Sequence, residues 1–490
     1  MNIRAVHPVP RVDGIKQTPG LLNQITEAGP YYTSYPALQQ WSTDFKHAHY
    51  EKALKEYLGG EGKDTPLHLY LHIPFCAKLC WYCICNIVIS NDRAKIQFFL
   101  DYLLREIALL RGFFERNGLK PNINEIHLGG GTPSHLDNAQ FTQLMEGLNT
   151  LVDIKSLDEV TMEIDPRTTT QENLRHFASK GVTRISFGIQ DFDLKVQEAI
   201  NRVQPPEMID ALLTPEIRSL FTGVNFDLLY GLPMQTRETF SNTMELDNKF
   251  HPERITLLKY AHAPEIRKHM KLIKEGDLPA ADDLPLMFVD TAQGLLERGY
   301  EWIGLDHFAI GTDDLAKAAR KNTVWRTFNG FTPGRSHNMI GLGPTTTAAF
   351  GRYYTQSAYD FGDYYKAIDA GHLPTFRGYV MSDDDLIRRE VIFSLLCDQK
   401  VDLSSVGQKF GVNGPEYFRK ELDRLGEGFS KDGLVNVNGG LVEVTTTGRF
   451  LIRKICRIFD NVTGKDAKPY KISQYTISNT RSQAPAKTGT

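Results

Sequence analysis

The sequence has no apolar run of about 18 residues, the length that a membrane-spanning helix needs. Its start also lacks the apolar core of a signal peptide. Six cysteines among 490 residues are too few for a disulfide scaffold. We therefore expect a cytoplasmic protein with reduced thiols and no membrane partner.

An excess of charge of either sign is also missing. Lys and Arg total 56 against 59 Asp and Glu, a formal net charge of −3. Proteins whose main partner is nucleic acid carry a basic excess, so we expect no nucleic-acid partner. The 41% hydrophobic and 23% charged residues are ordinary for a folded protein.

A chain of 490 residues is long enough for two or three domains. We expect a helical or irregular N-terminal segment, a strand-and-helix domain, a mainly helical C-terminal domain and a flexible polar tail. These are predicted at residues 1–60, 61–365, 366–466 and 467–490. The C-terminal domain should hold helices at 384–396, 415–425 and 447–459, with a short β-rich piece at 434–444.

Strand-like runs alternate with helical patterns through the predicted main domain. The runs lie at residues 67–73, 123–128, 159–164, 184–189, 224–229, 254–260 and 302–305. The clearest helix spans 94–113, where apolar residues recur at the i, i+3, i+4 spacing of one buried face. This alternation predicts an α/β fold with parallel strands. Periodicity alone does not choose between an open doubly wound sheet and a partial or complete β/α barrel.

Polar or glycine-rich clusters follow six of these strands, where α/β folds place functional residues. The first is followed by cysteines in the spacing Cys76-x3-Cys80-x2-Cys83, with Cys85 two residues later. Zinc sites usually combine two separated knuckles, and no second knuckle exists here. Three thiolates on one loop suit a cubane iron–sulfur cluster with one open iron. Zinc and structural or redox thiols remain the alternatives. Cys397 and Cys456 lie alone in the sequence and read as buried thiols.

These motifs resemble the oxygen-independent coproporphyrinogen III oxidases of the radical S-adenosylmethionine (SAM) superfamily. The resemblance covers residues 29–460 and rests on YTSYP, YLHIPFC, the cysteine loop, GGGTP, EIDPR, GIQDF, DLLYGLP, YAH, LDHFA, RREVIFSLLC and TTTGRFLIRKIC. It implies a partial or complete TIM-like radical SAM barrel with a smaller, mainly helical C-terminal domain.

The resemblance also implies roles for individual residues. Cys76, Cys80 and Cys83 would bind a [4Fe–4S] cluster. Residues near a first SAM molecule would be Tyr70, Gly130, Glu163 and Thr347, and those at a second would be Tyr82, Gly131, Thr132, Gln190, Arg202, Asp227 and Ala261. Tyr70, His72, Cys85 and Glu163 would act in the reaction. The alternative for Arg202 is an ion pair within the protein, and the alternative for the glycines is a simple chain turn.

The implied reaction converts two propionates of coproporphyrinogen III to vinyl groups, giving protoporphyrinogen IX for haem synthesis. A radical derived from SAM would start it, and a flavodoxin or ferredoxin would supply the electron to a monomeric enzyme. The four carboxylates of the substrate would need local cations, for which Arg335, Arg326 and Lys259 are the candidates.

Five positions depart from the family pattern at presumed substrate walls. They are Tyr31, Ile84, Lys259, Asn329 and Thr347. These departures leave open a related enzyme for another tetrapyrrole, or a radical methyltransferase. A haem-trafficking protein without dehydrogenase activity is the third alternative, although Cys85 argues against it.

Overall fold

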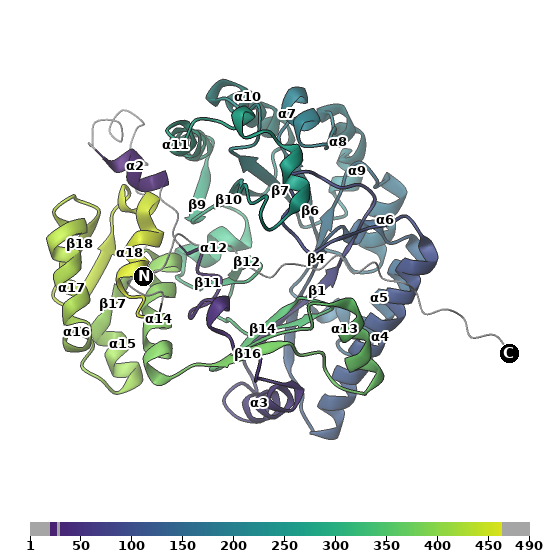
Figure 1. Cartoon of the computed structure of the whole chain (residues 1–490), viewed down its shortest axis with the longest axis horizontal. Helices are drawn as coiled ribbons and strands as arrows, with labels where there is room; N and C mark the ends of the chain where they lie inside the picture. The colour runs from purple at the N-terminus through teal and green to yellow at the C-terminus, as the bar shows by residue number, and fades with distance from the viewer. Residues whose placement is uncertain (1–19, 27–29, 463–490) are drawn as a thin grey trace.

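The computed structural model describes residues 20–26 and 30–462. A curved twelve-stranded sheet lies inside an arc of helices, and a mainly helical unit sits beside it (Figure 1). The α/β fold is therefore confirmed. The predicted tail at residues 467–490 and the first 19 residues lie outside the described part of the chain. In the part that is described, no helix combines the length and apolar character needed to cross a bilayer.

Seven neighbouring strands of the sheet are parallel, and six of them were expected. In spatial order they are β13 (Met339–Leu342), β1 (Pro66–Ile73), β4 (Asn122–Gly130), β5 (Glu159–Ile164), β6 (Arg184–Gln190), β7 (Gly223–Tyr230) and β8 (Arg254–Lys259). The helices cover the outer face of this curved array, as in a β/α barrel rather than a doubly wound sheet (Figure 1).

Antiparallel strands extend the sheet at both ends, and of these only the strand near residues 302–305 was predicted. β10 (His307–Ile310) inserts between β8 and β9 (Tyr300–Gly304), so the strand expected at 302–305 does not join β8 directly. At the other end lie β14 (Thr347–Phe350), β15 (Tyr353–Gln356) and β16 (Arg377–Val380). β16 carries the sheet beyond residue 365, the expected boundary. Within the described ranges β9 and β16 do not pair with each other, so the barrel is partial and open.

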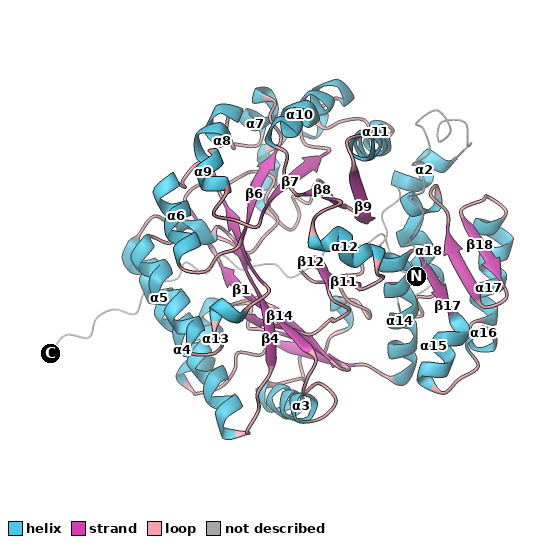
Figure 2. Ribbon diagram, turned by 180° about the vertical axis from the view of Figure 1, so that it is seen from behind, coloured by secondary structure: helices cyan, strands magenta, loops and turns pink. Residues whose placement is uncertain are grey.

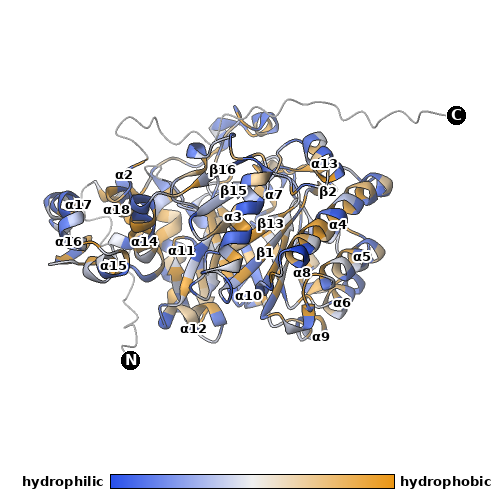
Figure 3. Cartoon of the chain, turned by 90° about the horizontal axis from the view of Figure 1, so that it is seen from below, coloured by the Kyte–Doolittle hydropathy of each residue, from blue (hydrophilic) through white to orange (hydrophobic). Residues whose placement is uncertain are grey.

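The outer helices bury one face each against the sheet. They are α4 (Arg93–Arg116), α5 (Asn138–Asn149), α6 (Gln171–Ser179), α7 (Leu194–Ala199), α8 (Pro206–Leu212), α9 (Pro215–Arg218), α10 (Arg237–Phe250), α11 (Asp283–Glu297) and α13 (Phe361–Asp369). In α4, the predicted helix, Asp92 accepts hydrogen bonds from the first backbone amides and so caps the start. Figure 3 shows apolar residues concentrated along the strands and the helix sides that face them.

The parallel strands alternate apolar and polar residues, which sends each kind to a different face. In β5, Val160, Met162 and Ile164 belong to the main hydrophobic core. Glu159 and Glu163 occupy the opposite, inner face of the curved sheet and pair with polar groups of neighbouring strands. The hydrophobic core therefore lies between sheet and helices, and the inner face is polar.

Four charged side chains close an ion-pair ring on this inner face, at the ends where the strands begin. Arg184 lies 2.7 Å from Glu159 and 2.8 Å from Asp313, and Arg254 lies 3.3 Å and 2.8 Å from the same two carboxylates. Burial alone would raise the pKa of Glu159, but the Arg254 and Arg184 guanidiniums lower it to about 2. The ring is neutral, and each charge in it has an opposite partner.

The C-terminal unit packs around α14 (Asp383–Asp398). Its remaining elements are β17 (Lys400–Asp402), α15 (Leu403–Phe410), α16 (Gly414–Tyr417), α17 (Arg419–Leu425), β18 (Val435–Asn438), β19 (Leu441–Val444) and α18 (Ile452–Ile458). The three strands form a separate small sheet in the order β17-β19-β18 (Figure 2). The unit reaches back to edge strand β9, where Arg449 donates to the carbonyl of Trp302 and Gln399 to that of Ile303.

The smaller elements connect these parts. They are α2 (Leu21–Thr26), α3 (His47–Gly59), β2 (Phe75–Cys76), β3 (Val88–Ile89), α12 (Asp314–Arg320), β11 (Val324–Thr327), β12 (Gly330–Pro333) and the short helical turns η1 (Leu38–Gln40), η2 (Pro133–His135), η3 (Ile154–Ser156), η4 (Lys268–Leu272), η5 (Glu275–Asp277), η6 (Gly426–Ser430) and η7 (Gly448–Leu451). β2 pairs with β3, and β11 pairs with β12 as a hairpin.

Glu106 of α4 is buried at 2% exposure and joins three elements. Its Oε2 accepts hydrogen bonds from the Gly343 amide at 2.8 Å and the Tyr364 hydroxyl at 2.6 Å. Burial raises the pKa of Glu106 from 4.5 to about 7, although both hydrogen bonds act in the other direction. The carboxyl group therefore holds its proton more tightly in the folded chain than in the unfolded one.

Glu106→Gln should change how stability depends on pH. Between pH 4.5 and about 7 the unfolded wild type releases this proton and the folded state keeps it, so stability falls as pH rises, by at most about 1.4 kcal/mol per pH unit. The variant lacks this loss and should gain stability relative to wild type across that window. Tm measured over the same pH range tests this. Glu115→Gln, an exposed site on the same helix, is the control, and a difference that is constant with pH would contradict the prediction.

Candidate cluster and cofactor site

The cysteine loop begins where β1 ends. Cys76 closes the short strand β2, and the loop to β3 carries Cys80, Cys83 and Cys85. Residues outside the loop form hydrogen bonds with its backbone. The Trp81 amide donates to the Ile200 carbonyl at 3.0 Å, and Asn201 Nδ2 donates to the Leu79 carbonyl at 2.8 Å. His269 Nε2 lies 2.7 Å from the Cys83 carbonyl. The loop is thus anchored to the segments after α7 and β8.

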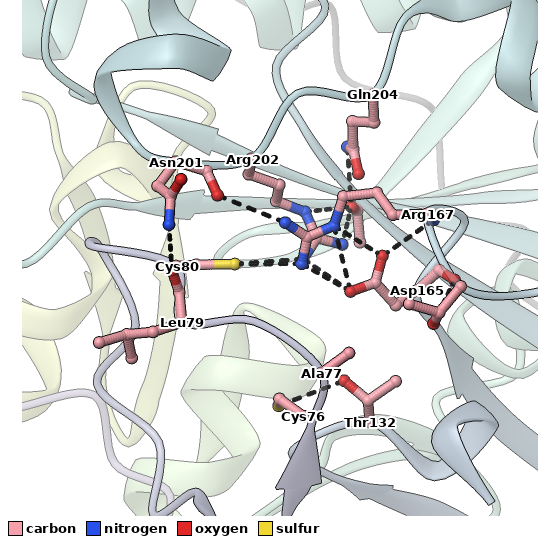
Figure 4. Close-up of polar contacts among 12 residues, drawn as sticks. Cys76, Ala77, Leu79, Cys80, Thr132, Asp165, Arg167, Asn201, Arg202 and Gln204 are labelled. Carbon is pink, nitrogen blue, oxygen red and sulfur yellow. Dashed lines mark hydrogen bonds and ion pairs between the residues drawn. The ribbon is translucent and has the colours of Figure 1, made fainter. Parts of the chain in front are cut away.

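Two of the loop sulfurs accept polar contacts from the rest of the site (Figure 4). The Thr132 hydroxyl donates to Cys76 Sγ at 3.3 Å. Arg167 and Arg202 donate to Cys80 Sγ at 3.4 and 3.5 Å. Cys85 is exposed, whereas Cys80 is buried. Hydrogen bonds to sulfur are among the contacts that tune an iron–sulfur cluster.

The donor set fits a cubane cluster. Among residues 20–26 and 30–462, no group of three or more His, Cys, Asp or Glu side chains is placed to bind a single metal ion. A cubane takes one thiolate on each ligated iron, so its ligands need not meet at one point. Burial raises the pKa of the Cys76 thiol to about 12, so ligation there must release a proton.

A second group of polar side chains lies where β1, β4 and β5 end. Tyr70 Oη is 3.3 Å from His72 Nδ1, and His127 Nε2 is 3.1 Å from Glu163 Oε1. The amide of Gly130 donates to Glu163 Oε2 at 3.3 Å. Gly130 has φ +114°, and a Cβ there would lie 2.5 Å from His72 Nδ1. Glycine is therefore required for this close approach, which goes beyond a simple chain turn.

Burial sets the protonation of this group. It raises the pKa of Tyr70 well above its ordinary value and lowers that of His72, so the phenol is protonated and the imidazole neutral. His72 Nε2 lies 2.9 Å from the Asn86 carbonyl, which assigns the ring proton to Nε2 and leaves Nδ1 to accept from Tyr70. Burial also raises the pKa of Asp227, which accepts from Ser186 at 2.8 Å and Asn225 at 2.9 Å.

The residues predicted for a second SAM molecule differ in their backbone conformation, their polar partners and their exposure. Gln190 has φ +66° after an irregularity in the β6–β7 pairing. Arg202 donates to the Gly188 carbonyl at 2.7 Å and lies 3.4 Å from Asp165, so the ion pair considered as its alternative role exists. Tyr82 packs against a cluster of apolar residues that includes Tyr260. Ala261 is exposed just after β8.

The remaining predicted positions lie near strand β1. Thr347 begins β14, and its carbonyl lies 2.6 Å from the Cβ that an alanine at Gly341 would have. Gly341 of β13 pairs in register with Tyr70, so β13 lies between Thr347 and the Tyr70 strand. Gly131 cannot carry a side chain either, since its Cβ would lie 2.7 Å from the Pro74 carbonyl carbon.

Four residues of the site were not predicted: His127, Asp165, Arg167 and Ser186. Asp165 and Arg167 belong to the EIDPR motif, but no role was assigned to them. His127 and Ser186 stand at inner-face positions of β4 and β6. The signal that could have found them is polar residues recurring at every second position of otherwise apolar strands.

Comparison with known proteins gives consistent matches over nearly the whole chain. Residues 70–246 match the radical SAM superfamily and residues 381–451 match the HemN C-terminal domain. A Salmonella typhimurium oxygen-independent coproporphyrinogen III oxidase is 36% identical over 454 residues, covering 93% of this chain and 97% of that protein. The Escherichia coli relative of the same name is 35% identical over the same coverage.

A solved structure agrees with these sequence matches. Coproporphyrinogen III oxidase (HemN) from Escherichia coli, described as a radical SAM enzyme, matches with a TM-score of 0.82 and 37% identity. The match covers 88% of this chain and 97% of that one. The expected radical SAM barrel and its C-terminal unit are confirmed.

Replacing Cys76, Cys80 or Cys83 with Ser should each prevent cluster assembly, because the loop offers three thiolates for three irons. Iron content and visible absorption after anaerobic reconstitution measure this. Cys85→Ser is the matched control and should keep its iron while losing turnover. Full iron content in all three single variants would contradict the assignment.

Proposed function

The chain belongs to the family of oxygen-independent coproporphyrinogen III oxidases, and from this membership we propose that it converts two propionates of coproporphyrinogen III to vinyl groups. It is a radical SAM oxidoreductase. The observation that carries the proposal is a three-cysteine loop facing a polar inner wall, in a chain similar to these oxidases along 93% of its length. Two SAM molecules, a monomeric state, a cytoplasmic location and a flavodoxin or ferredoxin donor are parts of the proposal.

Residues of the chain hold the reacting groups. Cys76, Cys80 and Cys83 would bind the cluster, and Glu163, fixed by His127 and the Gly130 amide, offers carboxylate oxygens to a SAM ribose or sulfonium. When bound, the cluster and SAM would supply one electron and a 5′-deoxyadenosyl radical that takes a hydrogen atom from a propionate β-carbon; loss of carbon dioxide would then leave the vinyl group, with the remaining electron passing to a one-electron acceptor. The inner wall orients these groups and excludes water.

Arg326, on strand β11 of the separate β11–β12 hairpin, is the candidate for a propionate contact. Its side chain is 5% exposed, yet its Nε and Nη1 have no hydrogen-bond partner among the described residues. The nearest carboxylate, Asp306, lies 3.8 Å away and is already bound to His307 at 2.6 Å. Buried N–H groups without partners are costly, and a propionate carboxylate would satisfy them.

The other two predicted cations differ in their surroundings. Lys259 ends β8, and burial together with nearby Arg453 lowers its pKa. Arg453 of α18 lies 4.4 Å from the ring centre of Tyr31, so the C-terminal unit adds positive charge near Lys259. Arg335 instead pairs with Asp398 at 2.8 Å and lies over Trp325, and the structure does not support it as a propionate contact.

The reaction itself is tested by product mass after anaerobic turnover with coproporphyrinogen III, SAM and a reductant. We expect two losses of a formic-acid equivalent per molecule. Added methyl groups would indicate a methyltransferase, and stoichiometric haem binding without turnover a trafficking protein. Turnover of another tetrapyrrole but not of coproporphyrinogen III would replace the proposed substrate.

Arg326→Gln should weaken coproporphyrinogen III binding by about 1.5–3 kcal/mol, roughly tenfold or more, because a charge-assisted hydrogen bond in a buried site is lost. Arg335→Gln is the matched control and should bind the substrate as wild type does. Affinity is measured anaerobically with iron content confirmed. Unchanged affinity in Arg326→Gln would remove this residue from the substrate site.

A further inference from the structure

The sulfur of Cys80 faces two arginines that share one carboxylate (Figure 4). Arg167 donates to Asp165 through Nε at 2.9 Å and Nη2 at 2.7 Å, and the same Nη2 reaches Cys80 Sγ at 3.4 Å. Arg202 Nη1 lies 3.4 Å from Asp165 and 3.5 Å from the sulfur. This arrangement is defined here as the Cys80 network: Cys80, Asp165, Arg167 and Arg202.

Three of the four members of the network are buried, and the Arg167 side chain is 12% exposed. Cys80, Asp165 and Arg202 are each at most 7% exposed. The Ser134 hydroxyl lies 3.1 Å from the Asp165 amide, which donates to it. A Cβ at Gly188 would lie 3.0 Å from Arg202 Nη2, so a side chain there would crowd the arginine.

The charges of the network balance only with a thiolate. Two guanidiniums and one carboxylate leave one positive charge beside the sulfur. A cysteine bound to iron is a thiolate, which brings the set to neutrality. Unpaired buried charge is strongly unfavourable, so the network suits a ligated Cys80 better than a free thiol.

Arg167 can be separated from SAM binding. Arg202 is a predicted SAM contact, but Arg167 is not, and its Nη1 is engaged with the Asn201 carbonyl at 3.3 Å. Its remaining donors go to Asp165 and Cys80. A change at Arg167 therefore removes positive charge near the sulfur and leaves the predicted SAM residues in place.

We propose that Arg167, together with Arg202, raises the reduction potential of the cluster held by Cys80. Reduction moves one electron from a low-potential flavodoxin or ferredoxin, which is oxidised, and no bond forms or breaks. The added negative charge is stabilised by the guanidiniums, and N–H···S hydrogen bonds shift the potential in the same direction. This inference rests on the proposed function, because it needs a cluster that is reduced in the reaction.

The test compares Arg167→Gln with Arg175→Gln, an exposed arginine paired with Glu216 on the same domain. Full-length protein is reconstituted anaerobically and poised at set potentials, and reduced cluster is counted by electron paramagnetic resonance. At a fixed potential, Arg167→Gln should lower the reduced-to-oxidised ratio about tenfold, which is 59 mV for one electron. Arg175→Gln should match wild type.

Asp165→Asn provides a test of opposite sign. It removes negative charge from the network and should raise the reduced-to-oxidised ratio at the same potential. A normal ratio in Arg167→Gln with full iron content would overturn the proposal. If Arg167→Gln loses iron, an unchanged or lowered ratio in Asp165→Asn would overturn it. If the variants change the reduced-to-oxidised ratio as expected but the wild type does not decarboxylate coproporphyrinogen III, the proposed function is wrong and this inference stands.

Discussion

Arg184 is buried on the inner face of the sheet, and its guanidinium lies between the carboxylates of Glu159 and Asp313. Arg254 completes the ring with the same two carboxylates. Removing one partner of a buried pair leaves a charge uncompensated, at a cost of about 3–5 kcal/mol. The polar inner face is therefore stable only because its charges are matched. This neutral ring lies at the end where the strands begin, and the polar residues of the candidate site lie toward the opposite end.

The buried arginines of the chain differ in how completely other groups of the protein pair with them. Arg184 and Arg254 are each paired with two carboxylates of the chain itself, although Nη1 of Arg184 has no hydrogen-bond partner among the described residues. Arg326 has orphaned donors, and the Cys80 network keeps one positive charge in excess. Under the proposed function, a propionate would supply the missing anion in the first case and an iron-bound thiolate in the second.

The sequence predicted elements whose signal is local. The helix at 94–113 and the strand at 159–164 show their periodicity within a short window, and both are present. β10 was missed because four residues carry too little pattern, and its insertion beside β8 depends on tertiary pairing. The cysteine loop could be found from spacing, whereas Arg335 and Arg326 look alike in sequence. Only their surroundings, Asp398 for the first and unpaired N–H groups for the second, tell them apart.

The contacts of Arg449 and Gln399 with strand β9 have a consequence for synthesis on the ribosome. β9 is an edge strand, and exposed strand edges tend to pair with other chains. Arg449 follows Trp302 by 147 residues, so at the usual pace of translation it emerges roughly 7–30 seconds later. During that interval the nascent barrel has an uncovered edge. Chaperone demand during expression should therefore be greatest before the C-terminal unit has emerged.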